Sequence, residues 1–167
     1  KFKMTSVPKV IDVELALQEK IPDIYKKIPG VLIRLMEKVI RQADMNRMIH
    51  ESSHLNGIPL VDWVLDQFGV NIVVKGKKLI PKKGRYIYPA NHPIGGLDGL
   101  AIVSVVAKIH PLIKFVANDL LRVIKGFDSI SLYIARFGQI NRRNAILINK
   151  TLASEAQLLV QPAGTVS

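Results

Sequence analysis

The sequence predicts an α/β fold, a mixed, largely parallel sheet with crossover helices, preceded by an N-terminal helical region. Two patterns support this prediction. Up to residue 69 the apolar residues recur at helical spacing, whereas after it short β-branched runs alternate with segments of helical length. A segment of helical length between two strands is typical of a parallel βαβ unit. We therefore expect a helical region over residues 1–69 and an α/β domain over 70–167.

The clearest helix of the N-terminal region covers residues 32–40. Its apolar residues recur at i, i+3, i+4, i+7 and i+8, the spacing of a single stripe: Leu32, Leu35, Met36, Val39 and Ile40. We expect this stripe to pack on the rest of the protein, and a helix lying in the plane of a membrane surface is the alternative. Further helices are expected over residues 10–18, 46–56 and 59–68.

The second region carries the predicted strands. We expect strands at 70–74, 85–88, 112–117, 137–141 and 158–161, with helices at 100–109 and 145–156. The chain stops shortly after the last strand and its Pro162-Ala163-Gly164 turn. We therefore expect the natural chain to continue, so that the domain is truncated at its C-terminus.

Composition narrows the function classes. The chain has 167 residues, 49% of them hydrophobic, a net charge of +11 and no cysteine. The apolar content argues against disorder, and the lack of cysteine excludes disulfides and thiol chemistry in this chain. The longest apolar run, residues 100–107, is far shorter than the ~20 residues that span a bilayer. The positive charge indicates anionic partners: nucleic acid, an anionic membrane face, or acidic or phosphorylated ligands.

Six basic residues flank the loop after the first predicted strand: Lys75, Lys77, Lys78, Lys82, Lys83 and Arg85. A solvated loop and a docking surface for anionic lipid head groups or an acidic carrier protein remain alternatives. Nucleic acid is disfavoured because no DNA- or RNA-binding motif accompanies the charge.

One metal motif occurs. His50-Glu51-Ser52-Ser53-His54 matches H-E-x-x-H, in which two imidazoles one helical turn apart bind zinc. The longer form of this motif needs a third histidine where Leu60 stands. We favour a surface helix with two ordinary histidines and expect no metal.

Residues 88–99 form the most informative segment, since they are rich in glycine and lie between a strand and its crossover helix. Open α/β sheets bind ligands at this edge. His92 would project from the strand end, and Asp98 would start the helix, where a carboxylate accepts backbone hydrogen bonds and can orient an imidazole. A histidine held in one tautomer suits a general base. The alternative is a helix-capping aspartate beside an incidental histidine.

Asn91-His92 followed by Asp98 resembles the N-H-x-x-x-x-D block of the glycerophospholipid (lysophosphatidic-acid-type) acyltransferase superfamily. The resemblance is stronger to its bacterial N-H-P-x-G-G-x-D branch, which is often labelled putative hemolysin and includes amino-acid-lipid O-acyltransferases. Residues 116–121 resemble the next segment of that branch, residues 138–143 lie where the second block has a phosphate-binding arginine, and residues 162–167 align with the third block, P-E-G-T-R-S.

Two departures from the superfamily pattern matter. Five residues rather than four separate His92 from Asp98, as in the Gly-Gly branch. In the third block Ala163 and Val166 replace Glu and Arg, side chains that the family uses for glycerol phosphate. An amino-acid lyso-lipid is therefore a credible acceptor.

The resemblance implies an acyltransferase-type sheet and an O-acyltransferase. It would move a fatty acyl group from an acyl carrier protein or coenzyme A thioester to a hydroxyl of a lysophospholipid or lyso-amino-acid lipid. His92 would be the general base and Asp98 would orient it. The implied substrate-binding residues are Asn91, Gly95, Gly96, Arg142, Arg143, Gly164 and Thr165.

The same resemblance implies no cofactor besides the thioester co-substrate. The expected partners are the lyso-lipid, the thioester donor and an anionic membrane surface, with the protein peripheral on the cytoplasmic side and not bound to nucleic acid. A non-catalytic module that binds membranes or a carrier protein is the alternative. It would need the basic run and the stripe of residues 32–40, but neither His92 nor Asp98.

Overall fold

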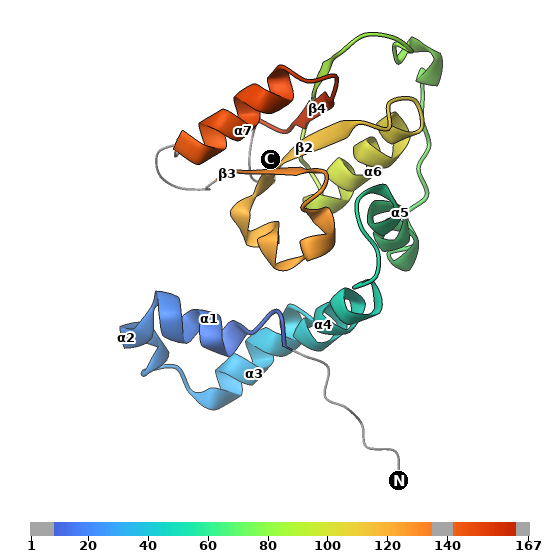
Figure 1. The fold of residues 1–167 in the computed structure, drawn as a ribbon. Coiled ribbons are helices and arrows are strands. Elements are labelled where there is room, and N and C mark those ends of the chain that lie inside the picture. The colour runs from blue at the N-terminus through green and yellow to red at the C-terminus, as the bar shows by residue number, and fades with distance from the viewer. Residues whose placement is uncertain (1–8, 135–141, 163–167) are drawn as a thin grey trace. The chain divides into compact units, whose positions relative to one another are not determined.

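The computed structural model describes residues 9–134 and 142–162 (Figure 1). The chain divides into two compact units, Lys1–His54 and Leu55–Ser167. This division lies upstream of the boundary expected at residue 69.

Four helices form the first unit: α1 (Val13–Lys20), α2 (Pro22–Tyr25), α3 (Gly30–Val39) and α4 (Gln42–Glu51). Two buried amide side chains of α4 hold the segment that enters α1. Asn46 Oδ1 accepts hydrogen bonds from Val10 N at 3.0 Å and Ile11 N at 2.7 Å, and Gln42 Oε1 accepts one from Val13 N at 2.7 Å. Because these amides satisfy backbone groups that no helix satisfies, this unit is organised by polar contacts as well as by apolar packing.

Within the first unit, most of the apolar stripe of α3 is exposed, and its packing on the rest of the protein stays a prediction. Leu35 and Val39 are 53% and 72% exposed, whereas Ile33 is only 5% exposed. The reason is the turn into α4, where Glu37 Oε1 accepts a hydrogen bond from Gln42 Nε2 at 3.1 Å. This contact turns the side of α3 that carries Ile33 and Glu37 toward α4, and the stripe faces outward.

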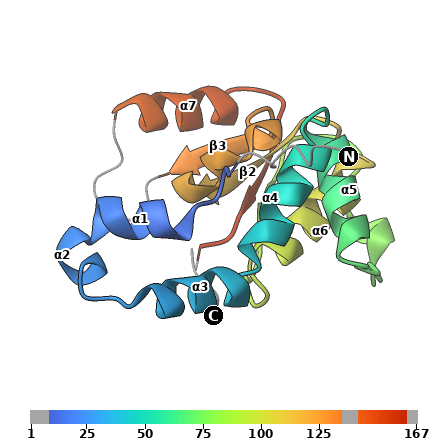
Figure 2. The ribbon, with the colours of Figure 1, turned by 90° about the horizontal axis from the view of Figure 1, so that it is seen from below.

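The second unit contains a sheet of four parallel strands in the order β1-β4-β2-β3. The strands are β1 (Ile87–Pro89), β2 (Ile113–Asn118), β3 (Ser131–Ile134) and β4 (Gln157–Val160). Helices α5 (Ile58–Gln67) and α6 (Gly96–Ala107) cover one face and α7 (Arg142–Leu152) covers the other (Figures 1 and 2). Three short 3₁₀ helices complete the unit: η1 (Lys77–Leu79), η2 (Asp119–Val123) and η3 (Lys125–Phe127). The predicted fold class, parallel sheet with crossover helices after a helical region, is confirmed.

The core of this unit lies between the sheet and the helices α5 and α6. Leu60 and Val61 of α5, Val103 of α6 and Leu159 of β4 are at most 1% exposed. In β2 buried and partly buried residues alternate, which is the pattern of a strand with one face on the core. Helix α5, expected in the N-terminal region, thus belongs to the packing that supports the sheet.

Several predicted elements differ from the observed ones. Residues 70–74 form no strand, and α4 ends at Glu51 although a helix was expected through residue 56. Strand β3 was not predicted, and the strand expected at 137–141 lies outside the described residues. Within the described ranges, no helix is both long and apolar enough to cross a membrane.

Candidate active site

His92 lies just beyond the carboxyl end of β1. The pairing with β4 extends one residue past the strand, because Ala90 N donates to Val160 O at 3.0 Å. After Ala90 the chain leaves the sheet in a short loop that contains Asn91 and His92. The last strand residues thus fix where His92 emerges, at the edge where open parallel sheets bind ligands.

Gly95 sets the entry into α6. It is the N-cap residue, with φ 83° and ψ −149°, a combination that is nearly restricted to glycine. Helix α6 then starts at Gly96 and places Asp98 in its first turn. A carboxylate there is favoured by the positive end of the helix dipole.

His92 and Asp98 meet across this loop. His92 Nδ1 lies 2.7 Å from Asp98 Oδ1, and Asp98 Oδ2 accepts a hydrogen bond from Ile94 N at 2.9 Å. The two side chains are 19% and 13% exposed, so both are largely shielded from solvent while the imidazole keeps some access. The structure therefore holds one oxygen of the carboxylate on the imidazole and the other on the loop backbone.

The environment keeps Asp98 ionised. Burial alone would raise the pKa of Asp98, but hydrogen bonds from Ile94, Gln161 and His92 outweigh it and hold the pKa below the ordinary value of 3.8. Because an ionised carboxylate only accepts hydrogen bonds, Nδ1 of His92 carries the proton of that contact. Nε2 is thereby the ring nitrogen left to accept a proton, as a general base requires.

Gln161 is the residue that sequence reasoning missed. It directly follows β4, and its Nε2 donates to Asp98 Oδ1 at 2.7 Å and to Asn91 O at 3.0 Å. From the sequence it is expected only as the last residue of a strand. Its role depends on β4 lying beside β1, a pairing that periodicity does not reveal.

The other predicted site residues are less closely tied to this pair. Arg142 is exposed at the start of α7, and none of the described contacts joins it to His92 or Asp98. Arg143 lies in α7, with a side chain outside what the structure describes, and Gly164 and Thr165 lie outside the described residues.

The H-E-x-x-H motif does not form a metal site in the described residues. His50 and Glu51 end α4, whereas His54 follows the helix, so the two imidazoles do not stand one turn apart on the same helix. Within the described ranges no group of three His, Cys, Asp or Glu is arranged to hold a metal ion.

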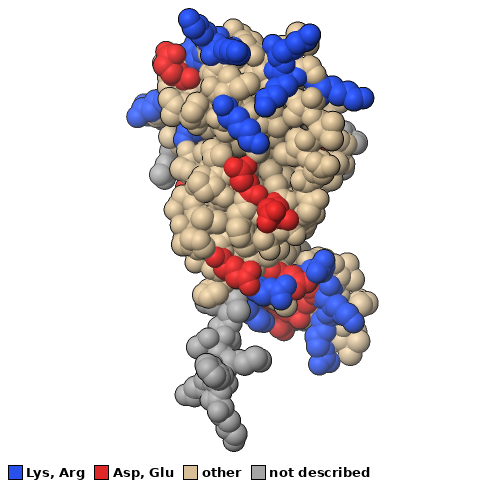
Figure 3. All heavy atoms as spheres, turned by 90° about the vertical axis from the view of Figure 1, so that its right-hand side faces the viewer, with Lys and Arg blue, Asp and Glu red and all other residues tan. Residues whose placement is uncertain are grey.

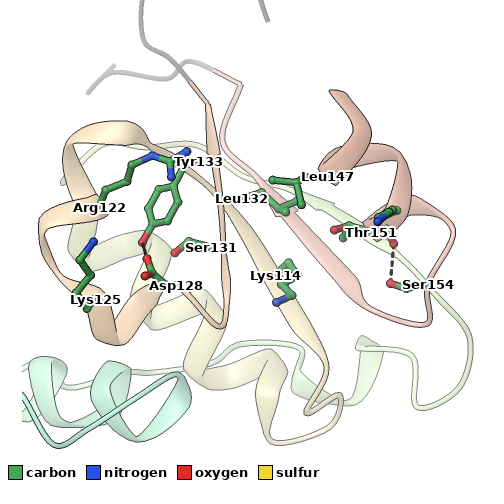
Figure 4. A pocket seen from close by; sticks show the side chains of 11 residues that line it. Lys114, Arg122, Lys125, Asp128, Ser131, Leu132, Tyr133, Leu147, Thr151 and Ser154 are labelled. Carbon is green, nitrogen blue, oxygen red and sulfur yellow. Dashed lines mark hydrogen bonds between the residues drawn. The ribbon is translucent and has the colours of Figure 1, made fainter. Parts of the chain in front are cut away.

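A cavity of about 630 Å³ lies elsewhere in the second unit, around the edge strand β3 and α7 (Figure 4). Lys114, Arg122, Lys125 and Lys150 are among its lining residues. Tyr133 also lines this cavity, and its hydroxyl donates a hydrogen bond to Asp128 Oδ1 at 2.9 Å. Burial, together with this contact, raises the pKa of Tyr133 to about 12. A phenol so hard to deprotonate is a poor base near neutrality. The His92–Asp98 pair is therefore the better candidate for the reaction centre.

The basic residues between α5 and β1 are all exposed: Lys75, Lys77, Lys78, Lys82, Lys83 and Arg85. Figure 3 shows Lys and Arg side chains gathered at the upper end of the second unit, where Figure 1 places this segment. Among the described contacts of these six side chains is one hydrogen bond, which the Arg85 guanidinium donates to Ser154 O at 3.0 Å. This segment offers positive charge to an anionic partner without a buried binding pocket.

Comparison with known proteins adds the family context. A sequence profile described as acyltransferase matches residues 15–167. The chain is 29% identical to a lyso-glycine lipid O-acyltransferase of Bacteroides thetaiotaomicron over 95% of its own length and 58% of that protein. It is 25% identical to a lyso-glycine lipid O-acyltransferase of Phocaeicola vulgatus, over 95% of this chain and 57% of that protein. No solved structure was found to match.

Proposed function

Because this chain belongs to the acyltransferase family, we propose that it carries the catalytic centre of an enzyme that transfers a fatty acyl group from a thioester to a hydroxyl of a lyso-lipid. The contact between His92 Nδ1 and Asp98 Oδ1, at 2.7 Å, carries this proposal. The two curated relatives, both named as lyso-glycine lipid O-acyltransferases, support the class of acceptor. This chain spans 58% and 57% of their lengths, so the activity of the whole protein is part of the proposal.

The mechanism follows from the tautomer of His92. Nε2 removes the proton of the acceptor hydroxyl as its oxygen attacks the thioester carbonyl. The tetrahedral intermediate collapses, the carbon–sulfur bond breaks, and the leaving thiolate takes the proton back from the imidazolium. Asp98 keeps the ring oriented and stabilises the imidazolium while it exists. Acyl transfer by direct attack needs no acyl-enzyme, in keeping with a chain that contains no cysteine.

The start of α6 is our candidate for stabilising the oxyanion. Ile94 N is engaged by Asp98, whereas helix N-termini leave their first backbone N–H groups without helical partners. A Cβ at Gly96 would meet no atom within 4 Å, so a substrate could approach the backbone there closely. We assign acceptor or donor contacts to Asn91, Gly95 and Gly96, and phosphate contacts to Arg142 or Arg143. Gly164 and Thr165 keep the acceptor-binding role that the family resemblance implies.

One set of assays can identify both the acyl acceptor and the acyl donor. We propose an amino-acid lyso-lipid in preference to a glycerol phosphate, because Ala163 and Val166 lack the charge of the residues that the resemblance would place there. The full-length protein should be assayed with a lyso-glycine lipid and with lysophosphatidic acid. Each acceptor should be offered the same acyl group on acyl carrier protein and on coenzyme A.

His92→Ala is the decisive variant in that assay. We expect it to lower the turnover at least about 10²-fold, which is the usual contribution of general-base catalysis. His54→Ala is a matched control, because His54 is exposed and lies in the other unit. Equal turnover by wild type and His92→Ala would exclude the proposed mechanism. If His92→Ala still binds vesicles but shows no turnover, catalysis is distinct from membrane binding, and the protein is more than a module that only binds.

We further propose that the protein works at a membrane surface, on the side where acyl thioesters are available. Support comes from α3, whose exposed Leu35 and Val39 form an apolar stripe, while Arg34 and Lys38 lie exposed on the same helix. Replacing Leu35 and Val39 together by Lys should lower co-flotation with anionic vesicles at least about tenfold, since each apolar side chain contributes about 1.5–3 kcal/mol when buried. Leu15→Lys, the same change at an exposed site outside the stripe, is the control. Unchanged flotation of the double variant would contradict this role.

A further inference from the structure

Gln161 joins the end of β4 to two segments that lie 70 and 63 residues earlier in the sequence. Its Nε2 donates to Asp98 Oδ1, in the first turn of α6, at 2.7 Å and to Asn91 O, in the loop after β1, at 3.0 Å. The residue itself directly follows β4. One uncharged side chain therefore ties the end of β4 both to the carboxylate and to the loop that carries His92.

Gly99 makes room for this side chain. A Cβ built at Gly99 would lie 2.8 Å from Gln161 Oε1, closer than real Cβ contacts come. The atom met is the far end of a flexible side chain, so any larger residue at position 99 would displace Gln161 with little direct cost to the fold. Helix α6 is thus shaped, one residue after Asp98, to accept Gln161.

The same oxygen of Asp98 serves Gln161 and His92. Oδ1 accepts from both, at 2.7 Å each, while Oδ2 accepts from Ile94 N. Without Gln161 the carboxylate would keep one backbone donor and the imidazole, and its rotation would be opposed by fewer contacts. An amide is suited to this position because it donates at every pH and adds no charge of its own.

We propose that Gln161 is a positioning residue of the reaction centre: its amide holds the Asp98 carboxylate oriented on His92 and fixes the His92 loop to the end of β4. This inference rests on the proposed acyl transfer through His92. Gln161 acts through Asp98 and touches neither substrate.

Gln157 provides a matched control on the same strand. It begins β4, and it bridges β4 to the segment before β1 in the same manner: Oε1 accepts from Tyr86 N at 2.8 Å and Nε2 donates to Gly84 O at 3.1 Å. Both glutamines thus tie β4 to the β1 side of the sheet, one at each end. Only Gln161 reaches Asp98.

The first test compares Gln161→Leu with Gln157→Leu in the full-length protein. We expect Gln161→Leu to lower kcat about tenfold or more, the effect of one hydrogen bond to a charged group, with little change in KM for the lyso-lipid. Carbon-13 NMR of the Asp98 carboxyl should show its titration moved to higher pH in Gln161→Leu and unmoved in Gln157→Leu. Gln161→Glu, which keeps the length but replaces the donor by a second carboxylate, should be more damaging than Leu.

The second test uses Gly99→Ala. It should lower kcat in the wild-type background by displacing Gln161 and cause no further loss in the Gln161→Leu background. The inference is overturned if Gln161→Leu keeps wild-type kcat, if the Asp98 titration does not move, or if the losses from Gly99→Ala and Gln161→Leu simply multiply. His92→Ala is assayed alongside. If His92→Ala is fully active, the proposed function fails; if it is inactive and Gln161→Leu is normal, the assignment of Gln161 alone fails.

Discussion

Asp98→Asn is the sharpest perturbation of the candidate site, because it keeps the shape of the side chain and removes one acceptor. The wild-type carboxylate accepts from His92 Nδ1 and Gln161 Nε2 at 2.7 Å on Oδ1, and from Ile94 N at 2.9 Å on Oδ2. A carboxamide has one acceptor oxygen and one amino group. The carboxamide therefore cannot accept both from His92 and Gln161 on one side and from Ile94 N on the other.

Each orientation of the new amide has a calculable cost. With its oxygen toward His92, the amino group faces Ile94 N–H and two donors meet. With the amide reversed, the amino group faces Gln161 and donates to His92 Nδ1, which selects the wrong tautomer. Because the bond from Ile94 N is exposed to solvent, its loss costs about 0.5–1.5 kcal/mol of stability. The turnover should fall about 10³- to 10⁴-fold, as when the aspartate of a Ser-His-Asp triad becomes asparagine.

The assay combines turnover, unfolding and nitrogen-15 NMR of the His92 ring. Asp62→Asn is the control, because Asp62 accepts from Ser104 Oγ at 2.6 Å, which an asparagine oxygen can also do. We expect that control to stay within about twofold of wild-type turnover. Turnover of folded Asp98→Asn within tenfold of wild type, with the ring tautomer unchanged, would refute the orienting role of Asp98.

The pH dependence of stability provides a second test with the same Asp98→Asn variant. The pKa of Asp98 is depressed in the folded state, so its ionised form contributes stability that is present above the unfolded pKa, near 3.8, and is lost as the pH falls through the folded value. Wild type should therefore be more stable than Asp98→Asn by a constant amount at neutral pH. The difference in unfolding free energy should narrow below about pH 4. A difference that persists into strong acid would show that the charge of Asp98 contributes nothing to it.

Three further predictions concern the surrounding fold. Gly95→Ala should cost about 1–3 kcal/mol in urea unfolding because φ is 83° there, whereas Gly96→Ala, with open space around its Cβ, should not destabilise; equal effects would contradict the backbone argument. Tyr133→Phe should lower the unfolding free energy by about 1 kcal/mol, because it removes the hydrogen bond to Asp128. The folded pKa of Tyr133 is raised to about 12, so wild type, but not Tyr133→Phe, should lose this stability between about pH 10 and 12. Alkaline unfolding measures this difference. Tyr88→Phe should leave thermal stability unchanged or raised, since the Tyr88 hydroxyl is buried without a hydrogen-bond partner among the described residues; a clear drop in Tm would show that the hydroxyl has one.

The elements found from the sequence are those with a strong local signal. The strand β2, the helix α5 with Pro59 in its first turn and the glycine-rich turn before α6 were all predicted from local sequence. His92 and Asp98 stand six residues apart, and one turn plus the start of a helix is enough to bring them together. Their contact was therefore expected from the chain itself.

The elements that sequence reasoning misjudged depend on neighbours. Residues 70–74 are rich in β-branched side chains, yet they form no strand, because such residues favour an extended chain but a ladder needs a partner with free hydrogen-bonding groups. Strand β3 is only four residues long and nearly all buried, so it shows no alternation to detect. In α3 the contact of Glu37 with Gln42 turns a side other than the apolar stripe toward α4, and periodicity does not reveal that contact.

The sequence by itself determined the α/β class, the loop that carries His92 and Asp98, and the resemblance to an acyltransferase family, since these depend on residues close together in the chain. Only the tertiary structure decided that β4 lies between β1 and β2. That order brings Gln161 onto Asn91, 70 residues away, and onto Asp98, 63 residues away. Strand order depends on pairing between strands that are far apart in the sequence, which local hydrogen bonding and periodicity do not reveal.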